Sequence, residues 1–480
     1  MKKTLLSLAV VSSFLAAPLF ANKCIDNIDS LNRGQTIFLN HCELNSMDMP
    51  EIVAYLNKHP KIEAVFLNDN YIDSWGAQLL SEVNSPIRSI EISNNYVNDN
   101  GIALIAAMPA LKEIFASNNY IGDEGAKAIA THKNLDILDL SDNEITPIGA
   151  KALAELPKLV YINLNNNDRL GDETAIRFSQ ISTLSGIGLS GSEVTDNGVV
   201  ELAHNKHLND LDLSFTKITA YGIKAIAKHD NIRYLSLAYD RVRSDSLVDI
   251  AKNQKITSLD LSGNSLGDNA AEILSKNSVI DVLLLNDNEI GKKGANALAK
   301  NNIYALEISH NSLGDDGAAA LAKSPLAFGY LDISNNHISP KGAAALAKSS
   351  LWQLSLDNNN IGDEGALSLA KPVNFFMYLS VVNNQISDTG AIAFARSDKI
   401  FNLDVSYNHI TSVGLKVLSN SNIRVIADGN DVNAVKAKAK VKKPSLLFRT
   451  AALQHSCLNN HNDYCTTLAK HHFIDESILR

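Results

Sequence analysis

The residues of this 480-residue chain that are best suited to chemistry are its cysteines and the histidines beside two of them. The potential zinc ligands near the C-terminus are His455, Cys457, His461 and Cys465. Their spacing, H-x-C-x3-H-x3-C, is not that of a standard zinc finger. Cysteines of an exported chain are usually paired. We therefore predict two disulfides, Cys24–Cys42 and Cys457–Cys465, with a zinc site and, for Cys42, a buried free thiol as the alternatives.

Motifs of catalysis are missing from the sequence. It contains no H-E-x-x-H, no G-x-S-x-G and no Walker motif, and its glycines do not form G-x-G-x-x-G between a strand and a helix. Its acidic residues recur at a fixed period, which favours helix starts and strand surfaces over an acid–base pair. We predict that the protein is not an enzyme and has no cofactor.

Two columns of polar and aromatic residues are the better candidates for function. The first column is acidic and comprises Glu91, Asp139, Asp212, Asp260, Glu307, Asp332 and Asp404. The second comprises Tyr161, Tyr234, Tyr330 and Tyr378, and Phe215, Tyr239 and Tyr407 follow a few residues later. Tyrosines on an acidic surface are typical of binding anchors, although tyrosine also simply favours strands.

The elements that must hold these columns are visible in residues 135–158, LDILDLSDNEITPIGAKALAELPK. The first half alternates with period two, which predicts a strand, and the second half has helical spacing. Thr146 suits the helix N-cap and Pro147 the first helical position. Such a unit cannot bury its apolar face alone, so it must stack on copies of itself.

From Asn70 onward the copies recur every 22 to 25 residues. Asn143 marks a position, here called the ladder position, that is occupied in the other units by Cys42, Asn70, Asn95, Asn119, Asn167, Ser192, Thr216, Asp240, Asn264, Asn288, Asn311, Asn336, Asn359, Asn384, Asn408 and Asn430. We expect the asparagine amide to be buried, where it would satisfy backbone groups of its own and the adjacent unit. The sequence thus predicts 17 units.

The pattern L-x-x-L-x-L-x-x-N/C-x-L resembles the leucine-rich repeat family. Helix segments such as GAKALA at 149–154 and GAAALA at 317–322 and 342–347 resemble the ribonuclease-inhibitor-like subclass, most closely bacterial GALA-type repeats. The resemblance implies an α/β solenoid, a horseshoe with a parallel sheet on its concave face and helices outside, that binds proteins. Some GALA-type proteins are host-directed effectors with an N-terminal F-box. Residues 22–60 of this chain lack the leucine pattern of an F-box.

Aspartates and glycines recur at the predicted helix starts. We expect the aspartates four residues after the ladder position to be N-caps, namely Asp99, Asp123, Asp196, Asp268, Asp315, Asp363 and Asp388. Glycines near the same point, such as Gly149, should let helix and strand layers approach closely.

Three consecutive units break the pattern, because their ladder residues are Ser192, Thr216 and Asp240. Drift in a long array is one interpretation. The other is a segment shaped for a ligand, and the aromatic and acidic columns coincide with it. We predict a partner-binding site made of Asp212, Phe215, Tyr234, Tyr239, Tyr161 and Asp260.

The termini differ from the repeats. Residues 1–21, with Lys2 and Lys3 before an apolar run that ends near Ala21, predict a signal peptide. Residues 22–60 should form an N-terminal cap and the first repeat, 61–432 the solenoid, and 433–480 a basic linker with a C-terminal cap. We expect an exported protein, periplasmic or extracellular, with no membrane span once the signal is removed.

The net charge is −9, and it becomes −11 once residues 1–21 are removed. An acidic chain disfavours nucleic acid as a partner. We expect a monomer that binds a basic protein, as a host-directed, virulence-associated factor. The alternative is a periplasmic or surface scaffold that binds a bacterial envelope protein or a glycan.

Overall fold

The computed structural model describes residues 23–167, 169–324 and 329–430. The chain divides into two compact units, the first ending at Lys158 and the second beginning at Leu159. In both, short strands and short helices alternate along the chain.

Every strand is three residues long. The first unit contains β1 (Thr36–Phe38), β2 (Ala64–Phe66), β3 (Ser89–Glu91), β4 (Glu113–Phe115) and β5 (Ile137–Asp139). The second contains β6 (Tyr161–Asn163), β7 (Gly186–Gly188), β8 (Asp210–Asp212), β9 (Tyr234–Ser236), β10 (Ser258–Asp260), β11 (Val282–Leu284), β12 (Ala305–Glu307), β13 (Tyr330–Asp332), β14 (Gln353–Ser355), β15 (Tyr378–Ser380), β16 (Asn402–Asp404) and β17 (Arg424–Ile426).

The helices span one to three turns. The first unit contains α1 (Lys23–Asp26), α2 (Ile28–Leu31), α3 (Met49–Lys58), α4 (Ser74–Ser81), α5 (Asp99–Ala106), α6 (Asp123–Ile129) and α7 (Pro147–Leu153). The second contains α8 (Asp172–Ser179), α9 (Asp196–Leu202), α10 (Ala220–Ile226), the 3₁₀ turn η1 (Ser244–Ser246), α11 (Leu247–Ile250), α12 (Asp268–Leu274), α13 (Lys292–Leu298), α14 (Gly314–Leu321), α15 (Pro340–Leu346), α16 (Gly362–Leu369), α17 (Asp388–Ala395) and α18 (Ser412–Ser419).

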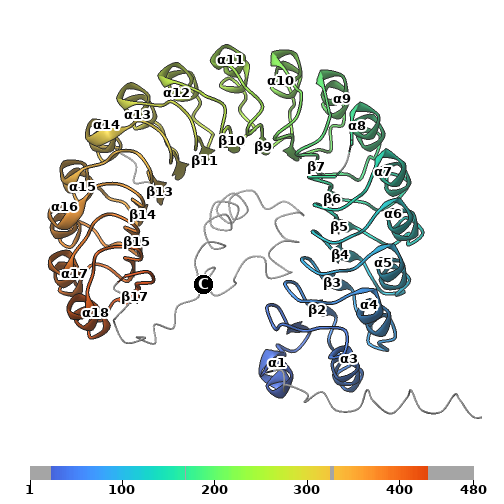
Figure 1. The fold of residues 1–480 in the computed structure, drawn as a ribbon. Coiled ribbons are helices and arrows are strands. Elements are labelled where there is room, and N and C mark those ends of the chain that lie inside the picture. Colours follow the sequence, from blue (N-terminus) through green and yellow to red (C-terminus); the bar gives the residue numbers. More distant parts are fainter. Residues whose placement is uncertain (1–22, 168, 325–328, 431–480) are drawn as a thin grey trace, which may run out of the picture. The chain divides into compact units, whose positions relative to one another are not determined.

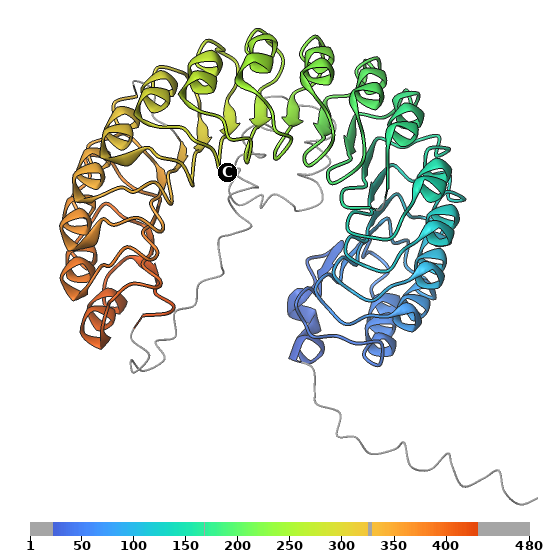
Figure 2. The ribbon, with the colours of Figure 1, turned by 45° about the horizontal axis from the view of Figure 1, so that its top comes forward.

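Within each unit, consecutive strands pair in parallel and the helices cover one side of the resulting sheet (Figures 1 and 2). Neighbouring strands are about 4.8 Å apart, whereas packed helices need about 8–10 Å. Each repeat is therefore a wedge, so a unit curves with its strands inside. The predicted 17 repeats and the predicted α/β solenoid, with a parallel sheet on the strand side and helices outside, are confirmed.

The core of each repeat comes from the predicted apolar positions. Leu135, Leu138, Leu140, Ile145 and Leu153 are all fully buried. The N-terminus of α7 is also as predicted, since Thr146 is the N-cap and accepts from the backbone N–H of Ile148.

The asparagine ladder has the predicted role. Asn143 Nδ2 donates to the carbonyl of Ala116 in the preceding repeat at 2.9 Å and to that of Ser141 at 3.0 Å. Its Oδ1 accepts from the backbone N–H of Ile121 at 3.0 Å. One buried side chain thus satisfies the backbone of two repeats, and it fixes their spacing.

The prediction that the helix-start aspartates are N-caps is wrong. Asp123 is the first residue of α6, and the N-cap is Gly122. The Asp123 carboxylate instead reaches the next repeat, where it accepts from Thr146 N at 2.9 Å, Thr146 Oγ1 at 2.7 Å and Gly149 N at 2.9 Å. We call this contact the aspartate staple. The other six are also helical residues rather than N-caps, namely Asp99, Asp196, Asp268, Asp315, Asp363 and Asp388.

Most glycines at the helix starts, Gly149 among them, make room for this staple rather than for a helix–strand contact. A Cβ on Gly149 would lie 2.7 Å from Asp123 Oδ1 and 2.9 Å from the Ala126 Cβ. Both atoms belong to the preceding repeat, so glycine permits neighbouring helix starts to approach closely.

Cys24 and Cys42 form a disulfide, as predicted, with their Cα atoms 5.7 Å apart. It ties α1 to the loop after β1. The predicted Cys457–Cys465 pair, the signal peptide and the C-terminal cap lie outside the described residues. Within the ranges that the structure describes, no helix is long and apolar enough to cross a membrane.

Candidate functional site

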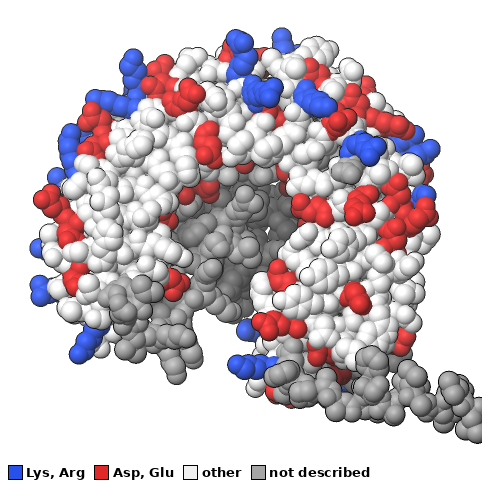
Figure 3. All heavy atoms as spheres, viewed as in Figure 1, with Lys and Arg blue, Asp and Glu red and all other residues white. Residues whose placement is uncertain are grey.

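The strand face of the second unit carries the predicted columns side by side. Strand register aligns Asp210, Tyr234 and Ser258 in one row and Asp212, Ser236 and Asp260 in the next. Across β6–β16, the first and third strand positions hold six carboxyls and no lysine or arginine: Asp210, Asp212, Asp260, Glu307, Asp332 and Asp404. In Figure 3 the lysines and arginines of this unit lie over its helices, and acidic side chains also occur at its inner edge.

A groove of about 700 Å³ on this face brings together five of the six predicted site residues, Asp212, Phe215, Tyr234, Tyr239 and Asp260. Tyr161 does not line it. Its ring lies on β6 against Gly186, where an added Cβ would be 2.6 Å from the ring. The groove extends to Asp287, Glu307 and His310, which the sequence analysis did not assign to the site. Whether these residues bind a partner stays a prediction.

Phe215 and Tyr239 are the exposed aromatic residues of the groove, with 55% and 42% of their surface accessible. Their rings stack with centroids 4.4 Å apart and an interplanar angle of 11°. The Tyr239 hydroxyl donates to Asp287 Oδ2 at 2.8 Å, and this hydrogen bond raises the pKa of Tyr239. Asp287 lies 3.8 Å from His310 Nδ1. The aromatic pair is therefore held in place on an acidic surface.

The backbone beneath these rings is strained. Phe215 and Tyr239 have φ of 56° and 59°, in the left-handed region that bulky residues rarely adopt. Most other repeats place Asn, Asp, His or Gly at this position, for example Asn166, Asn335 and Gly191. Asparagine and glycine tolerate such angles far better than phenylalanine and tyrosine. Strain of this kind concentrates at functional sites.

Gly263 provides the space that Tyr239 occupies. It has the same left-handed backbone, with φ of 69°, and a Cβ there would lie 2.2 Å from the Tyr239 ring. Phe215, Tyr239, Gly263 and Asp287 thus occupy the same position in consecutive repeats. A side chain at Gly263 would force the tyrosine away from Asp287.

Hydrogen bonds on both sides orient the Asp212 carboxylate. Asn165 Nδ2 donates to Asp212 Oδ2 at 2.9 Å, and Ser214 donates to Oδ1 through its backbone N–H at 3.0 Å and its hydroxyl at 2.7 Å. The Ser214 hydroxyl also lies 2.6 Å from that of Ser236. Asp212 is therefore a fixed negative charge in the groove rather than a mobile surface group.

Asp210 and Tyr234 are paired in the adjacent strands β8 and β9, next to Asp212. Burial, with a smaller contribution from the Asp212 carboxylate, raises the pKa of Asp210 to about 8. Burial and the neighbouring carboxylates, Asp212 foremost, raise the pKa of Tyr234 well above its ordinary value. At neutral pH both side chains are mainly protonated, so they offer hydrogen-bond donors beside an acceptor.

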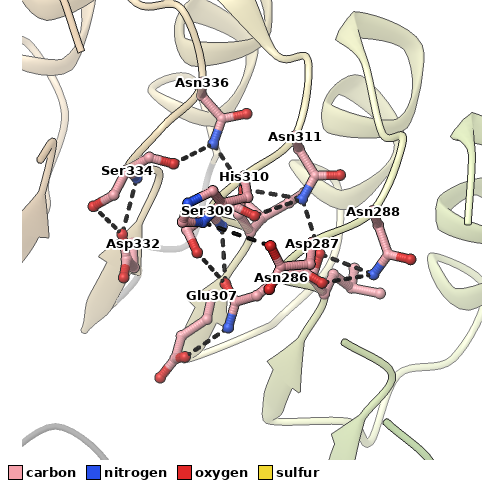
Figure 4. Close-up of polar contacts among 12 residues, drawn as sticks. Asn286, Asp287, Asn288, Glu307, Ser309, His310, Asn311, Asp332, Ser334 and Asn336 are labelled. Carbon is pink, nitrogen blue, oxygen red and sulfur yellow. Dashed lines mark hydrogen bonds and ion pairs between the residues drawn. The ribbon is translucent and has the colours of Figure 1, made fainter. Parts of the chain in front are cut away.

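The same organisation continues into the next strands (Figure 4). Asn286 Nδ2 donates to Glu307 Oε2 at 3.0 Å, and Asn286 Oδ1 accepts from the hydroxyl of Ser309 at 2.9 Å. Ser334 donates its hydroxyl to Asp332 Oδ1 at 2.6 Å. A serine or asparagine two residues beyond the strand thus positions a carboxylate of the acidic column.

The irregular repeats lie at the edge of this groove. Asp240 replaces the ladder asparagine, and its Oδ1 accepts from Thr216 N at 2.5 Å and Thr216 Oγ1 at 3.1 Å. A ladder asparagine would place its amide nitrogen here and donate to backbone carbonyls. Asp240 Oδ2 stands there instead and has no hydrogen-bond partner. Burial raises the pKa of Asp240 to about 7.

The next helix, α11, is only one turn long. A hollow of about 670 Å³ opens between Phe215, Tyr239 and Ser246.

Two further features were missed by the sequence analysis. The left-handed position could have been recognised, because Phe and Tyr stand out among the Asn, Asp and Gly of the other repeats. The second feature is a row of exposed tyrosines in the first unit, Tyr71, Tyr96 and Tyr120, each directly after a ladder asparagine. Successive ring centroids in this row are 6.3 Å apart.

Metal binding finds no support in the part of the chain that the structure describes, where no three His, Cys, Asp or Glu side chains gather as ligands. The predicted alternative ligands His455, Cys457, His461 and Cys465 lie outside it.

Comparison with protein families identifies the repeat. Residues 109–168 match a model described as leucine rich repeat. A second model of the same description matches residues 204–227, 252–275, 301–322, 330–347, 348–370, 374–395 and 402–419. A search of curated proteins gives no match.

Three solved structures illustrate the likeness of fold. One is the ectodomain of the Arabidopsis thaliana receptor kinase GASSHO1/SCHENGEN3 with CASPARIAN STRIP INTEGRITY FACTOR 2, at 16% identity and a TM-score of 0.39 over 78% of this chain and 51% of that chain. The chain thus spans about half of that ectodomain. The TLR13–ssRNA13 complex matches at 15% identity and 0.48 over 84% and 67%. An internalin (inlF) of Listeria monocytogenes matches at 20% and 0.34 over 80% and 94%. At these values the likenesses indicate nothing about partners.

Proposed function

We propose that this chain, whose repeats match leucine-rich repeat models, is a binding protein whose partner is a basic protein. Repeats of this fold generally serve as interaction scaffolds rather than as catalysts. The partner would bind the strand face of the second unit, in the groove that contains Asp212, Phe215 and Tyr239.

The observation that carries this proposal is the aromatic pair. Phe215 and Tyr239 stack on each other in left-handed backbone, half exposed, above a carboxylate-lined groove. The repeats on either side place Gly191 and Gly263 at this position, so a repeat can fold without an aromatic residue there. Interface energy concentrates in rigid aromatic anchors of this kind.

The acidic columns support a basic partner. Apart from the buried, protonated Asp210, five carboxyl residues and no lysine or arginine stand at the first and third strand positions across β6–β16. Opposite charge would steer such a partner to the face, and added salt would lower the association rate.

We also propose that the protein is exported to the periplasm or the extracellular space and has bacterial origin. The signal-like residues 1–21 and the Cys24–Cys42 disulfide support an oxidising compartment. The GAKALA and GAAALA helix segments support the GALA-type subclass and a host-directed role. N-terminal sequencing of native protein tests export: the chain should begin at Asn22, and an intact Met1 would contradict the proposal.

The alternative is a scaffold that binds a bacterial envelope protein or a glycan. The row of exposed tyrosines in the first unit favours it, since Asn94 and Asn118 add hydrogen-bonding amides along the same edge. Tyr96→Ala should abolish binding under the alternative and leave binding unchanged under the main proposal.

Capture experiments separate the two. Wild-type protein and three variants, Phe215→Ala/Tyr239→Ala, Tyr96→Ala and Tyr407→Ala, would be incubated with host and envelope lysates, and retained proteins identified by mass spectrometry. A partner that binds the groove should be retained by the wild type, Tyr96→Ala and Tyr407→Ala, and lost with the double variant. In 0.5 M salt the affinity of the wild type for this partner should fall roughly tenfold, so the partner should be released. Retention by the double variant would exclude the groove as the site.

A further inference from the structure

We propose that residues 436–448 of this same chain bind the strand face of the second unit and occupy the partner groove until a partner displaces them. The inference rests on the proposed function for the location of the groove, and it adds a regulator of that site.

Charge complementarity is the first argument. Residues 431–480 contain eight lysines and arginines against four acids, and five of the lysines fall within 436–443. Lys436, Lys438, Lys440 and Lys442 alternate with Ala or Val, so an extended chain presents them on one side. At the first and third strand positions of β6–β16 there are five carboxyls besides the protonated Asp210, and no lysine or arginine. This strand face is the natural counterpart of this segment within the molecule.

An apolar cluster on the same face is the second argument. Val282, Ala305 and Tyr330 lie in β11–β13, with Leu284 packed beside them, and only 1%, 2% and 6% of their surfaces are accessible. These fractions are typical of a covered surface, yet in the described part of the chain the helices pack on the opposite side of the sheet (Figure 1). Leu446, Leu447 and Phe448 follow the lysines and match this cluster in character.

The segment is long enough to reach both targets. The described chain ends at Asn430, just beyond β17. Because neighbouring strands are about 4.8 Å apart, β12 lies about 24 Å from β17, and β8 lies about 43 Å from it. An extended chain covers about 3.3 Å per residue, so Lys436 reaches about 20 Å and Lys443 about 43 Å. The lysines can therefore meet Asp332, Glu307 and Asp260, and residues 446–448 reach β11–β13 with slack.

Tethering gives the segment an advantage over a free partner. A short linker holds the lysines at a high effective concentration at the groove, so a partner must compete with them. The full chain should therefore bind basic ligands more weakly than a chain whose tail has lost its charge. Salt should weaken the internal contact.

A binding titration with full-length chains tests this. The probe is fluorescein-labelled decalysine. A tail variant replaces Lys436, Lys438, Lys440, Lys442 and Lys443 with Gln. A face variant combines Asp212→Asn, Asp260→Asn and Glu307→Gln, and a helix-side control combines Glu201→Gln, Glu272→Gln and Glu364→Gln. Melting curves establish that each variant folds.

The tail variant should bind the probe at least tenfold more tightly than wild type and the helix-side control, and the face variant should lose binding. Equal affinity of wild type and tail variant, with loss in the face variant, would overturn the tail proposal and leave the proposed function intact. Undiminished binding by the face variant would overturn the proposed function itself.

Carbodiimide cross-linking of the wild type at low salt gives a second measurement that needs no variant. Peptides from monomeric protein should join Lys436–Lys443 to Asp260, Glu307 or Asp332, and 0.5 M salt should remove them. Cross-links found only in dimers would assign the contact to a second copy, and links found only to helix-side acids would place the segment elsewhere. Either result would overturn the proposal.

Discussion

Phe215 and Tyr239 show how single residues in a regular array can mark a site. Each occupies a left-handed position that every other repeat in this series except that of Tyr407 gives to Asn, Asp, His or Gly. Such a conformation costs on the order of 1 kcal/mol or more for a bulky side chain. The stacked rings and the hydrogen bond to Asp287 offset part of this cost, and the proposed binding of a partner would explain why the rest is retained.

Tyr239→Asn should leave the free energy of unfolding unchanged or raise it by about 0.5–1 kcal/mol, because Asn suits the left-handed backbone. It should weaken partner binding about tenfold or more. Tyr407→Asn is the matched control, since Tyr407 has φ of 55° at the same position outside the groove. It should show the same stability change and unaltered binding. Chemical denaturation measures the free energy of unfolding of the two variants, and titration measures their affinity for the partner. Equal losses of affinity in Tyr239→Asn and Tyr407→Asn would count against the site.

Asp240 makes stability depend on pH. Its pKa is raised to about 7 in the folded protein from an ordinary 3.8, so the folded chain holds the proton more tightly than the unfolded chain. The resulting stabilisation is complete below about pH 4 and is lost as the pH rises through 7. Asp240→Asn should raise the free energy of unfolding by about 1–3 kcal/mol at pH 8 and by less at pH 5.

Denaturation of wild type and Asp240→Asn at both pH values measures this difference. Asp245→Asn, an exposed carboxylate a few residues away, is the control and should change little at either pH. A gain for Asp240→Asn that is larger at pH 5 would contradict the assigned protonation.

At the scale of elements, neighbouring repeats are joined by two ladders. The asparagine ladder joins the strand ends, and the aspartate staple joins the helix starts, where Asp123 accepts from Thr146 and Gly149. Burial alone would raise the pKa of Asp123, but these hydrogen bonds outweigh it and lower the pKa. Between α10 and α11 the staple position is Ala220, and there the regular helix start gives way to η1.

Asp123→Ala should lower the free energy of unfolding by about 1–3 kcal/mol, because three donors of the next repeat lose their acceptor. Glu155→Ala, at an exposed position just after α7, should change it by less than about 0.5 kcal/mol. Urea denaturation followed by circular dichroism compares them. Equal stability of the two variants would show that the staple does not hold the repeats together.

At the scale of the whole molecule, each repeat depends on its neighbours, so the ends need separate protection. The Cys24–Cys42 disulfide provides it at the N-terminal end, where it ties α1 to the first repeat. Closing a loop of this length typically stabilises a fold by about 2–3 kcal/mol.

Cys24→Ser/Cys42→Ser should therefore increase hydrogen exchange in β1 and α3 while leaving β10–β14 unchanged, because stability in a repeat array is largely local. Hydrogen exchange with mass spectrometry measures this directly. Uniform loss of protection along the chain would instead indicate that the array unfolds as one unit.

The sequence by itself determined the repeat, the strand and helix of each unit, the ladder and the two columns on the strand face. These features are periodic, and a period in the sequence becomes a row in space when every unit pairs in register. The sequence also predicted the Cys24–Cys42 pair, and five of the six residues that it predicted for the site line the groove. Only the tertiary structure could show those contacts that a side chain makes with the neighbouring repeat. The aspartates stand at helix starts and therefore resemble N-caps, but their carboxylates accept from donors 23 to 27 residues further along the chain. Gly263 and the strained backbone of Tyr239 likewise gain their meaning only from a ring that crosses from one repeat to the next.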